Sequence, residues 1–325
     1  MPLGRRINPT EANLPDTSGK GFEGRAEDAA ENAASGAQTL FRTEEPRYTF
    51  DDIILNKSTY DAIRDVLVLY EKRELLFDVW GLGATHKEQN RAGINLYGHS
   101  GTGKSMAAHA IAHRLGRRIL TVDYSQIESK YVGETSKNLV ALFKYAKETG
   151  SVIFFDEADA LLSRRVTDMS SSTDVSVNQT RSVLLVLINE YDDLIIFASN
   201  FISNYDPAFM RRILAHIKFE LPEEEERRKL WELYIPKQMP TDADIMLLAQ
   251  KFPGITGSDI SNAVLNASLR AAAENEPLVR HANFENAVTR IIESKADNAD
   301  IGKPISRRTV SEEYVKSQLG GELPK

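Results

Sequence analysis

The chain has no cysteine, which excludes disulfide bonds and thiolate metal ligands across all 325 residues. It also lacks long hydrophobic runs, because stretches such as Val183–Ile188 fall well short of the roughly 18 apolar residues that cross a bilayer. Arg5 and Arg6 are not followed by an apolar stretch, so the N-terminus does not indicate a secretory leader. We therefore expect no membrane contact and a cytoplasmic location.

The chain also has no excess of basic over acidic residues. The 40 basic and 47 acidic residues give a net charge of −7 and an isoelectric point near 5.5. This balance gives no overall attraction to nucleic-acid phosphates, so we expect no nucleic-acid partner. At about 150 residues per domain, the length predicts about two domains with a sizeable core.

Residues 1–46 are rich in Gly, Pro, Glu and Asn and offer little to a core. We interpret this stretch as a disordered tail, either a plain solvated extension or a partner-binding arm, and expect order to begin near Tyr48. Ser58–Asp61 has the form of a capping box. Tyr60, Ile63 and later apolar residues follow at helical spacing, which predicts a helix with one buried face.

Short apolar stretches then alternate with helical patterns over residues 47–221. The expected strands are 94–97, 119–122, 152–155, 195–198 and 217–219. Alternation of this kind predicts a parallel sheet, and the uninterrupted apolar stretch 152–155 suits a sheet covered by helices on both faces.

After Pro222 the apolar residues follow helical periods only. This predicts a small helical domain over residues 222–296, with helices at 223–234, 242–251, 258–273 and 284–294. Residues 297–325 are polar, and we expect a loosely held tail there.

The octet GHSGTGKS at residues 98–105 follows a predicted strand and opens a predicted helix. Its glycines let backbone N–H groups surround phosphate oxygens, and the helix N-terminus adds a partial positive charge. A lysine at this place neutralises the β- and γ-phosphates, and the following hydroxyl is a ligand for Mg²⁺. The pattern therefore predicts a site for a phosphate chain and Mg²⁺, formed by Gly98, His99, Ser100, Gly101, Thr102, Gly103, Lys104 and Ser105.

Two carboxylates, Asp156 and Glu157, follow the buried strand 152–155. Carboxylates at such a place are costly unless they meet a cation or a polarised water. We assign Asp156 to the Mg²⁺ shell and Glu157 to the water that attacks the γ-phosphate. The alternative is a strand that simply ends in solvent.

The next strand ends at Asn200, and neighbouring parallel strands end at the same edge of a sheet. Asn200 could therefore position the attacking water. Arg211 and Arg212 follow, and planar cations of this kind stabilise negative charge that develops on a phosphate. A solvated arginine pair is the alternative.

About three quarters of the chain, from Thr49 through the helical domain, resembles the AAA ATPases, the protein-remodelling branch of the AAA+ superfamily. The ordered set of the octet (Walker A), Asp156-Glu157 (Walker B), Asn200 (sensor 1) and the two arginines (arginine fingers) carries the resemblance. It implies an α/β P-loop NTPase fold, a three-layer parallel sheet with a C-terminal helical lid. It also implies ATP and Mg²⁺ as cofactors and a homo-oligomer, usually a six-membered ring, in which the arginines reach the neighbour's ATP. Further nucleotide contacts are implied for Asp52, Ile53, Met106, Gly257 and Ser258.

The resemblance also makes Lys130, Tyr131, Val132 and Gly133 look like the pore loop that grips a polypeptide. An aromatic beside an aliphatic residue on a loop with a glycine can contact a chain of any sequence. The alternative is that Tyr131 and Val132 are core residues at a helix end. The Ser/Thr-rich stretch 167–176 matches the position of a second pore loop.

Some positions depart from the family or carry weaker patterns. Residues 213–216 replace the aromatic, acidic and basic run that usually follows the arginines. No arginine sensor is assigned in the lid, although Arg270 is a candidate. His109 and His113 share a helix face like two metal ligands, but no third ligand is evident, so packed or solvated histidines are favoured over zinc.

The leading hypothesis is an ATP-driven protein remodeller or unfoldase that pulls a substrate polypeptide through the ring. The resemblance is compatible with disassembly of HORMA-domain complexes, as in bacterial relatives of the pachytene-checkpoint ATPases, with or without an adaptor. One alternative is a DNA-associated AAA+ protein for replication or transposition, which the acidic isoelectric point disfavours. Another is a nucleotide-operated scaffold, which Glu157 and the arginine pair disfavour.

Overall fold

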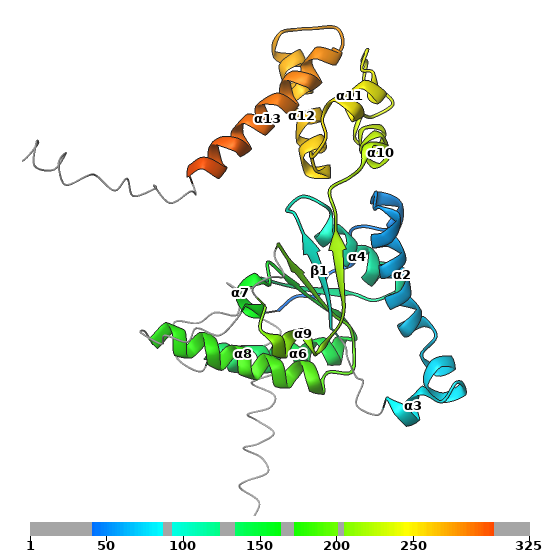
Figure 1. Cartoon of the computed structure of the whole chain (residues 1–325), viewed down its shortest axis with the longest axis vertical. Helices are drawn as coiled ribbons and strands as arrows, with labels where there is room; N and C mark the ends of the chain where they lie inside the picture. The colour runs from blue at the N-terminus through cyan, green and yellow to red at the C-terminus, as the bar shows by residue number, and fades with distance from the viewer. Residues whose placement is uncertain (1–40, 87–92, 124–133, 164–171, 201–204, 302–325) are drawn as a thin grey trace, which may run out of the picture. The chain divides into compact units, whose positions relative to one another are not determined.

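The computed structural model describes residues 41–86, 93–123, 134–163, 172–200 and 205–301 (Figure 1). The chain forms two compact units. Unit 1 comprises residues 1–47, 71–96 and 108–216, and unit 2 comprises residues 48–70, 97–107 and 217–325. Of the predicted tails at 1–46 and 297–325, residues 1–40 and 302–325 lie outside the described residues. None of the described helices is long and apolar enough to cross a membrane.

The strands form one five-stranded sheet in the order β2-β3-β4-β1-β5 (Figure 1). Their bounds are β1 Gly93–Gly98, β2 Ile119–Asp123, β3 Val152–Asp156, β4 Ile195–Ser199 and β5 Ile213–Phe219. The pairs β2–β3 and β3–β4 are parallel. The predicted α/β architecture is therefore confirmed. β5 starts four residues earlier than predicted, because residues 213–216 are part of the strand.

The alternation of side chains along β3 shows how both faces of the sheet are covered. Phe155 stacks on Phe197 of β4 with ring centroids 5.3 Å apart, and the same core contains Phe143 of α6 (Glu134–Thr149). Helix α8 (Ser172–Glu190) contributes to this core as well. Phe154 points to the opposite face, where His109 of α4 (Lys104–Arg114) meets it edge-on with ring centroids 6.5 Å apart.

Order in unit 1 begins earlier than expected. The prediction that it starts near Tyr48 is wrong, because Phe41 is only 5% exposed within the core. Glu44 exchanges backbone hydrogen bonds with Ile119 at the start of β2, with N···O distances of 2.9 and 3.0 Å. The edge strand β2 thus gains a short antiparallel partner, which composition alone did not indicate.

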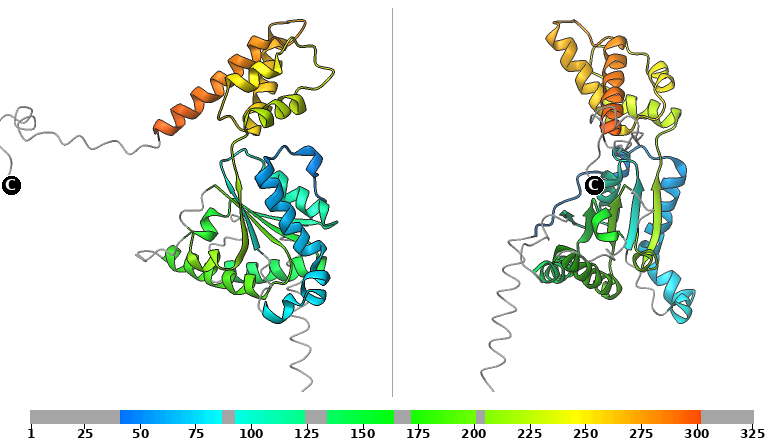
Figure 2. Two further views of the ribbon diagram at one scale, coloured as in Figure 1. Left: turned by 45° about the vertical axis from the view of Figure 1, so that its right-hand side comes forward. Right: turned by 60° about the vertical axis from the view of Figure 1, so that its left-hand side comes forward.

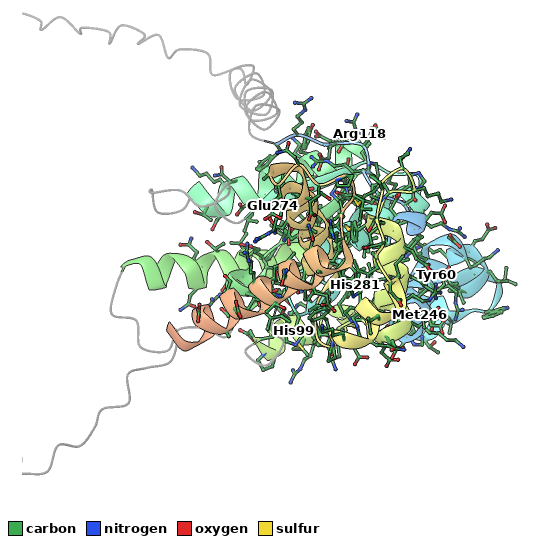
Figure 3. The ribbon with its side chains drawn as sticks, turned by 90° about the horizontal axis from the view of Figure 1, so that it is seen from above. Tyr60, His99, Arg118, Met246, Glu274 and His281 are labelled. Atoms are coloured by element: carbon green, nitrogen blue, oxygen red, sulfur yellow. The ribbon has the colours of Figure 1, made fainter. Side chains whose placement is uncertain are left out.

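Helix α2 (Lys57–Glu71) lies in unit 2 and starts from a different cap than predicted. The side-chain oxygen of Asn56 accepts the backbone N–H of Thr59 at 2.9 Å, so Asn56 and not Ser58 caps the helix. Tyr60 is 48% exposed (Figure 3), whereas Thr59 and Ile63 are buried. The predicted helix is confirmed, but its buried face is rotated away from Tyr60.

Shorter elements connect these parts. They are the 3₁₀-helix η1 (Phe50–Asp52), the π-helical turn η2 (Leu75–Val79), and the one-turn helices α3 (Leu82–Thr85), α7 (Asp159–Leu162) and α9 (Pro207–Met210).

Four helices form the C-terminal part of unit 2: α10 (Glu224–Tyr234), α11 (Ile245–Lys251), α12 (Gly257–Ala273) and α13 (His281–Ile301). The predicted helical domain is therefore present, although α13 continues past residue 297, where we expected a tail. Trp231 and Phe284 meet edge-on in its core, with ring centroids 6.0 Å apart.

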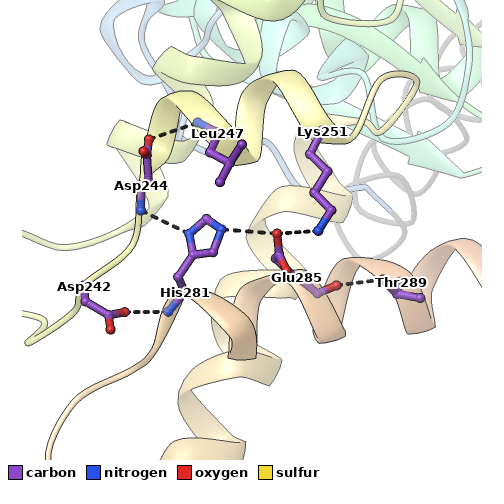
Figure 4. A network of polar contacts seen from close by, with 7 residues as sticks. All are labelled: Asp242, Asp244, Leu247, Lys251, His281, Glu285 and Thr289. Atoms are coloured by element: carbon purple, nitrogen blue, oxygen red, sulfur yellow. Dashed lines mark hydrogen bonds and ion pairs between the residues drawn. The ribbon is translucent and has the colours of Figure 1, made fainter.

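A polar network joins α11 to the start of α13 (Figure 4). The Asp244 N–H donates to Nδ1 of His281 at 3.1 Å, so the ring proton lies on Nε2, which faces Glu285 at 3.2 Å. Lys251 Nζ donates to the same carboxylate at 2.6 Å and holds the pKa of Glu285 below its usual value. Each polar group at this helix junction is thereby matched by a partner.

Candidate functional site

The loop between β1 and α4 bends at three glycines in the left-handed region of φ. The φ angles are 145° at Gly98, 79° at Gly101 and 97° at Gly103. A Cβ on Gly98 would lie 2.1 Å from the carbonyl oxygen of Phe219, so no side chain fits there. This backbone course lets consecutive N–H groups face one concave surface at the helix N-terminus.

Lys104, the first residue of α4, folds back over this loop. The side chain is buried, and its Nζ donates to the carbonyl oxygens of Gly98 at 2.8 Å and His99 at 2.9 Å. Thr102 Oγ1 donates to the same His99 oxygen at 2.8 Å. The loop thus holds an ammonium group at its centre, where a phosphate chain needs a counter-charge.

A pocket that belongs wholly to unit 2 opens beside the loop. It brings together eight of the predicted nucleotide contacts: Asp52, Ile53, Gly101, Thr102, Gly103, Met106, Gly257 and Ser258. It also contains residues that the sequence analysis missed: Ile54, Leu55, Asn56, Thr59, Phe219, Glu220, Pro222, Glu226, Leu230 and Tyr234. One side of the pocket is therefore a polar loop and another carries aliphatic and aromatic side chains.

The N-terminus of α12 sits directly on the phosphate loop. Thr256 caps α12 through a capping box with Asp259, and Ser258 N donates to the Gly101 carbonyl at 3.2 Å. Lys295 of α13 donates to the buried Asp259 carboxylate at 2.6 Å. The Thr-x-x-Asp spacing was a readable capping signal that the sequence analysis did not use.

The residues at this site fit a magnesium-bound triphosphate. Backbone N–H groups, a helix N-terminus and an ammonium group suit the phosphates. The hydroxyl of Ser105, the residue after Lys104, is a hard oxygen ligand of the kind that Mg²⁺ prefers.

The two predicted acids stand at the end of β3 in unit 1. Asp156 is half-buried and lies opposite Asp123 in the β2–β3 register. Glu157 is exposed and has φ 50°, a left-handed conformation that is uncommon for a residue with a Cβ. Its N–H donates to Asp156 Oδ1 at 2.9 Å. Strained backbone of this kind concentrates at functional sites.

Asn200 follows β4, the neighbour of β3. Its backbone N–H donates to Asp159 Oδ2 at 3.0 Å. The Asp159 carboxylate, which the sequence patterns did not single out, therefore holds the backbone at the end of β4. Just before it, Ser199 Oγ lies 3.3 Å from Asn95 Oδ1 in the buried interior. Tyr205 joins this cluster, and burial raises its pKa to about 12, so it stays a neutral phenol.

The predicted arginine pair follows α9, and its two members differ. Arg212 donates from Nε to Asn189 Oδ1 at 2.7 Å and from Nη1 to the Ala208 carbonyl at 2.9 Å. Arg211 is exposed at the C-terminal end of α9. Arg212 is therefore anchored within unit 1, whereas Arg211 faces solvent.

Other predicted sites are placed as follows. Lys130, Tyr131, Val132 and Gly133 lie outside the described residues, as do residues 167–171 of the predicted second loop. Residues 172–176 begin helix α8, so the prediction of a loop is wrong for that half of the stretch. Among the described residues, no group of three or more His, Asp or Glu side chains could hold a metal.

The two remaining candidates have other partners. His109 is buried, accepts the Arg47 N–H at 3.3 Å, and has its pKa lowered by burial. It is therefore a packed histidine, the alternative favoured over zinc. Arg270 pairs with Glu274 at 3.0 Å and does not line the pocket.

Residues 94–221 match the model of the ATPase family associated with various cellular activities (AAA). The chain is 31% identical over 264 residues to a proteasome-activating nucleotidase of Methanopyrus kandleri, covering 79% of this chain and 59% of the relative. It is 32% identical over 253 residues to a 26S proteasome regulatory subunit 8 homolog of Encephalitozoon cuniculi, covering 74% and 62%. The chain thus spans about three fifths of the length of these relatives.

Proposed function

We propose that the chain, whose residues 94–221 match the model of the AAA ATPase family, hydrolyses Mg-ATP and uses the energy to remodel or unfold another protein. The observation that carries the proposal is the phosphate loop with Lys104 at its centre, opening into a pocket with an apolar wall. This combination suits a nucleotide, because its phosphates need donors and its base needs apolar contact.

The chain's own groups divide the work of binding. The loop N–H groups and Lys104 hold the phosphates, while Ile54, Leu230 and Tyr234 offer the base an apolar surface. Ser105 and Asp156 would hold Mg²⁺, which neutralises charge on the β- and γ-phosphate oxygens. Glu157 would take the proton of the attacking water on its carboxylate, and Asn200 would orient that water.

We extend the proposal to a homo-oligomeric ring of six subunits. An exposed arginine beside an anchored one suits action on a neighbour's ATP, because Arg211 can reach outward while Arg212 fixes the end of α9. The similar proteins are, by name, a proteasome-activating nucleotidase and a proteasome regulatory subunit, which supports a substrate that is a protein.

The finer parts of the proposal concern the substrate. Lys130, Tyr131, Val132 and Gly133 would form the pore loop that grips the polypeptide. A HORMA-domain complex, with or without an adaptor, is the substrate we put to the test, and the cytoplasm is the proposed location.

The first experiment measures phosphate release by the purified full chain with Mg-ATP. Lys104→Ala should abolish binding of a fluorescent ATP analogue, whereas Glu157→Gln should keep binding and lose at least about 100-fold in hydrolysis rate. Lys144→Ala, an exposed lysine on α6, is the matched control and should leave both unchanged. A wild-type chain that never consumes ATP at any concentration contradicts the proposal.

A second experiment separates remodelling from hydrolysis. Tyr131→Ala should stop ATP-dependent unfolding of a test substrate while most of the ATPase rate remains. Proteins retained by the Glu157→Gln variant with ATP identify the natural substrate, and their lack of HORMA domains would remove that part of the proposal. Salt-resistant retention of DNA would favour the DNA-associated alternative.

A further inference from the structure

A polar groove lies between α12 and α13 in unit 2, and it shares no lining residue with the nucleotide pocket. The two helices pack side by side (Figures 1 and 2). Helix α12 contributes Asn262, Asn266 and Arg270 to the groove, and α13 contributes Asn286, Arg290 and Lys295. Apart from Lys295, which pairs with Asp259 of the α12 cap, these side chains have no role in the proposed ATPase cycle.

Asparagine is an unexpected choice at three of these positions. Inside a helix it is less favourable than alanine, because its side chain competes for backbone hydrogen bonds. Asn262 and Asn266 are one turn apart on α12 and share a face, and Asn286 lies on α13. All three are exposed, and their side chains make no hydrogen bond within the part of the chain that the structure describes. The donors and acceptors of these three exposed amides are therefore open to a ligand.

The charges around the groove favour an anionic ligand. Arg290 is exposed and forms no ion pair with any described residue. Asp259 is the one acidic residue that lines the groove among those described, and Lys295 already pairs with it at 2.6 Å. Arg270 pairs with Glu274 at its own helix surface, 3.0 Å away. An incoming carboxylate would thus meet Arg290 without a competing anion.

The residues that line the groove also favour a peptide over a nucleic acid as its ligand. Amide side chains carry both a donor and an acceptor, which match the alternating N–H and C=O groups of an extended main chain. The described lining includes no aromatic side chain on which a base could stack.

We propose that this groove binds an extended acidic polypeptide segment, with the asparagines pairing with its main chain and Arg290 with its carboxylates. The site lies on the helical domain and goes beyond the proposed ATPase function, because it recognises a second protein chain independently of the nucleotide.

The test uses the full chain and a fluorescein-labelled peptide of alternating Glu and Gly, with an alternating Lys and Gly peptide for comparison. Fluorescence anisotropy should show binding of the Glu peptide only. Arg290→Ala and the double variant Asn266→Ala with Asn286→Ala should each raise its Kd at least about tenfold. Alanine favours the helix, so loss of folding does not explain a loss of binding.

Arg280→Ala is the matched control, since Arg280 is exposed near the start of α13, pairs with Glu276 and does not line the groove. It should keep the Kd within about twofold, and all variants should keep the wild-type ATPase rate. Failure of the wild type to bind the Glu peptide, an equal loss with Arg280→Ala, or tighter binding of a single-stranded oligonucleotide would each overturn the proposal. The ATPase rate in the same samples reports on the proposed function separately.

Discussion

At Gly98 the backbone leaves no room for a side chain. Its φ is 145°, and a Cβ at this position would lie 2.1 Å from the Phe219 carbonyl oxygen, so both conformation and space exclude alanine. We predict that Gly98→Ala lowers the free energy of unfolding by about 3 kcal/mol and weakens ATP binding, as measured by urea unfolding and nucleotide titration. Gly116→Ala has left-handed φ but open space around its Cβ, so it should cost only about 1 kcal/mol. Equal losses for both variants would contradict the steric argument.

The buried His109 and the half-buried His216 make the free energy of unfolding depend on pH. Burial lowers the pKa of His109 and His216 below 6.5. Below pH 6.5 the two histidines are therefore protonated in the unfolded chain before they are protonated in the folded chain. The free energy of unfolding decreases as the pH falls, by up to about 1.4 kcal/mol per pH unit for each histidine.

Urea unfolding at several pH values from about 7 downward measures this slope. His216→Leu should flatten it, whereas His113→Leu, at an exposed position on the same α4 as His109, should leave it unchanged. A slope that His216→Leu does not alter would show that another group titrates.

The N-terminus of α12 is the element through which the helical domain meets the phosphate loop. Thr256 caps α12, and a Cβ on Gly101 would lie 2.8 Å from its Oγ1. We predict that Thr256→Ala lowers the free energy of unfolding by about 1 kcal/mol and raises the Kd for ATP several-fold. Thr256→Ser keeps the hydroxyl and should restore both. Thermal unfolding and nucleotide titration measure the two effects, and an unchanged ATP affinity would argue that the cap acts on stability alone.

At the scale of the assembled molecule, we expect hydrolysis to need a neighbour. Arg211→Ala should lower the ATPase rate about 100-fold or more, because one charged donor at the reacting phosphate is lost. Mixing Arg211→Ala with Lys104→Ala should recover activity, since the second subunit still supplies its Arg211 to the first. A mixture of Lys104→Ala with Glu157→Gln should stay inactive. No recovery in the first mixture would mean that Arg211 does not act across subunits.

Short-range sequence patterns were sufficient to predict much of the fold and of the phosphate loop. The octet at 98–105, the apolar strands and the helical periods each lie within a few residues, so alternation and composition were enough to predict the sheet, the loop and the helical domain. The phosphate-loop residues lie together for the same reason, because a tight turn between a strand and a helix is a local structure.

Features that depend on contacts between residues far apart in the sequence became visible only in the tertiary structure. The pocket combines Ile54, Gly101 and Ser258, which lie far apart along the chain. Burial of Phe41 needs β2 beside it, and the choice between an anchored Arg212 and an exposed Arg211 depends on where Asn189 lies. Such contacts follow from packing of whole elements against one another, and the periodicity of a single segment carries no information about its partner.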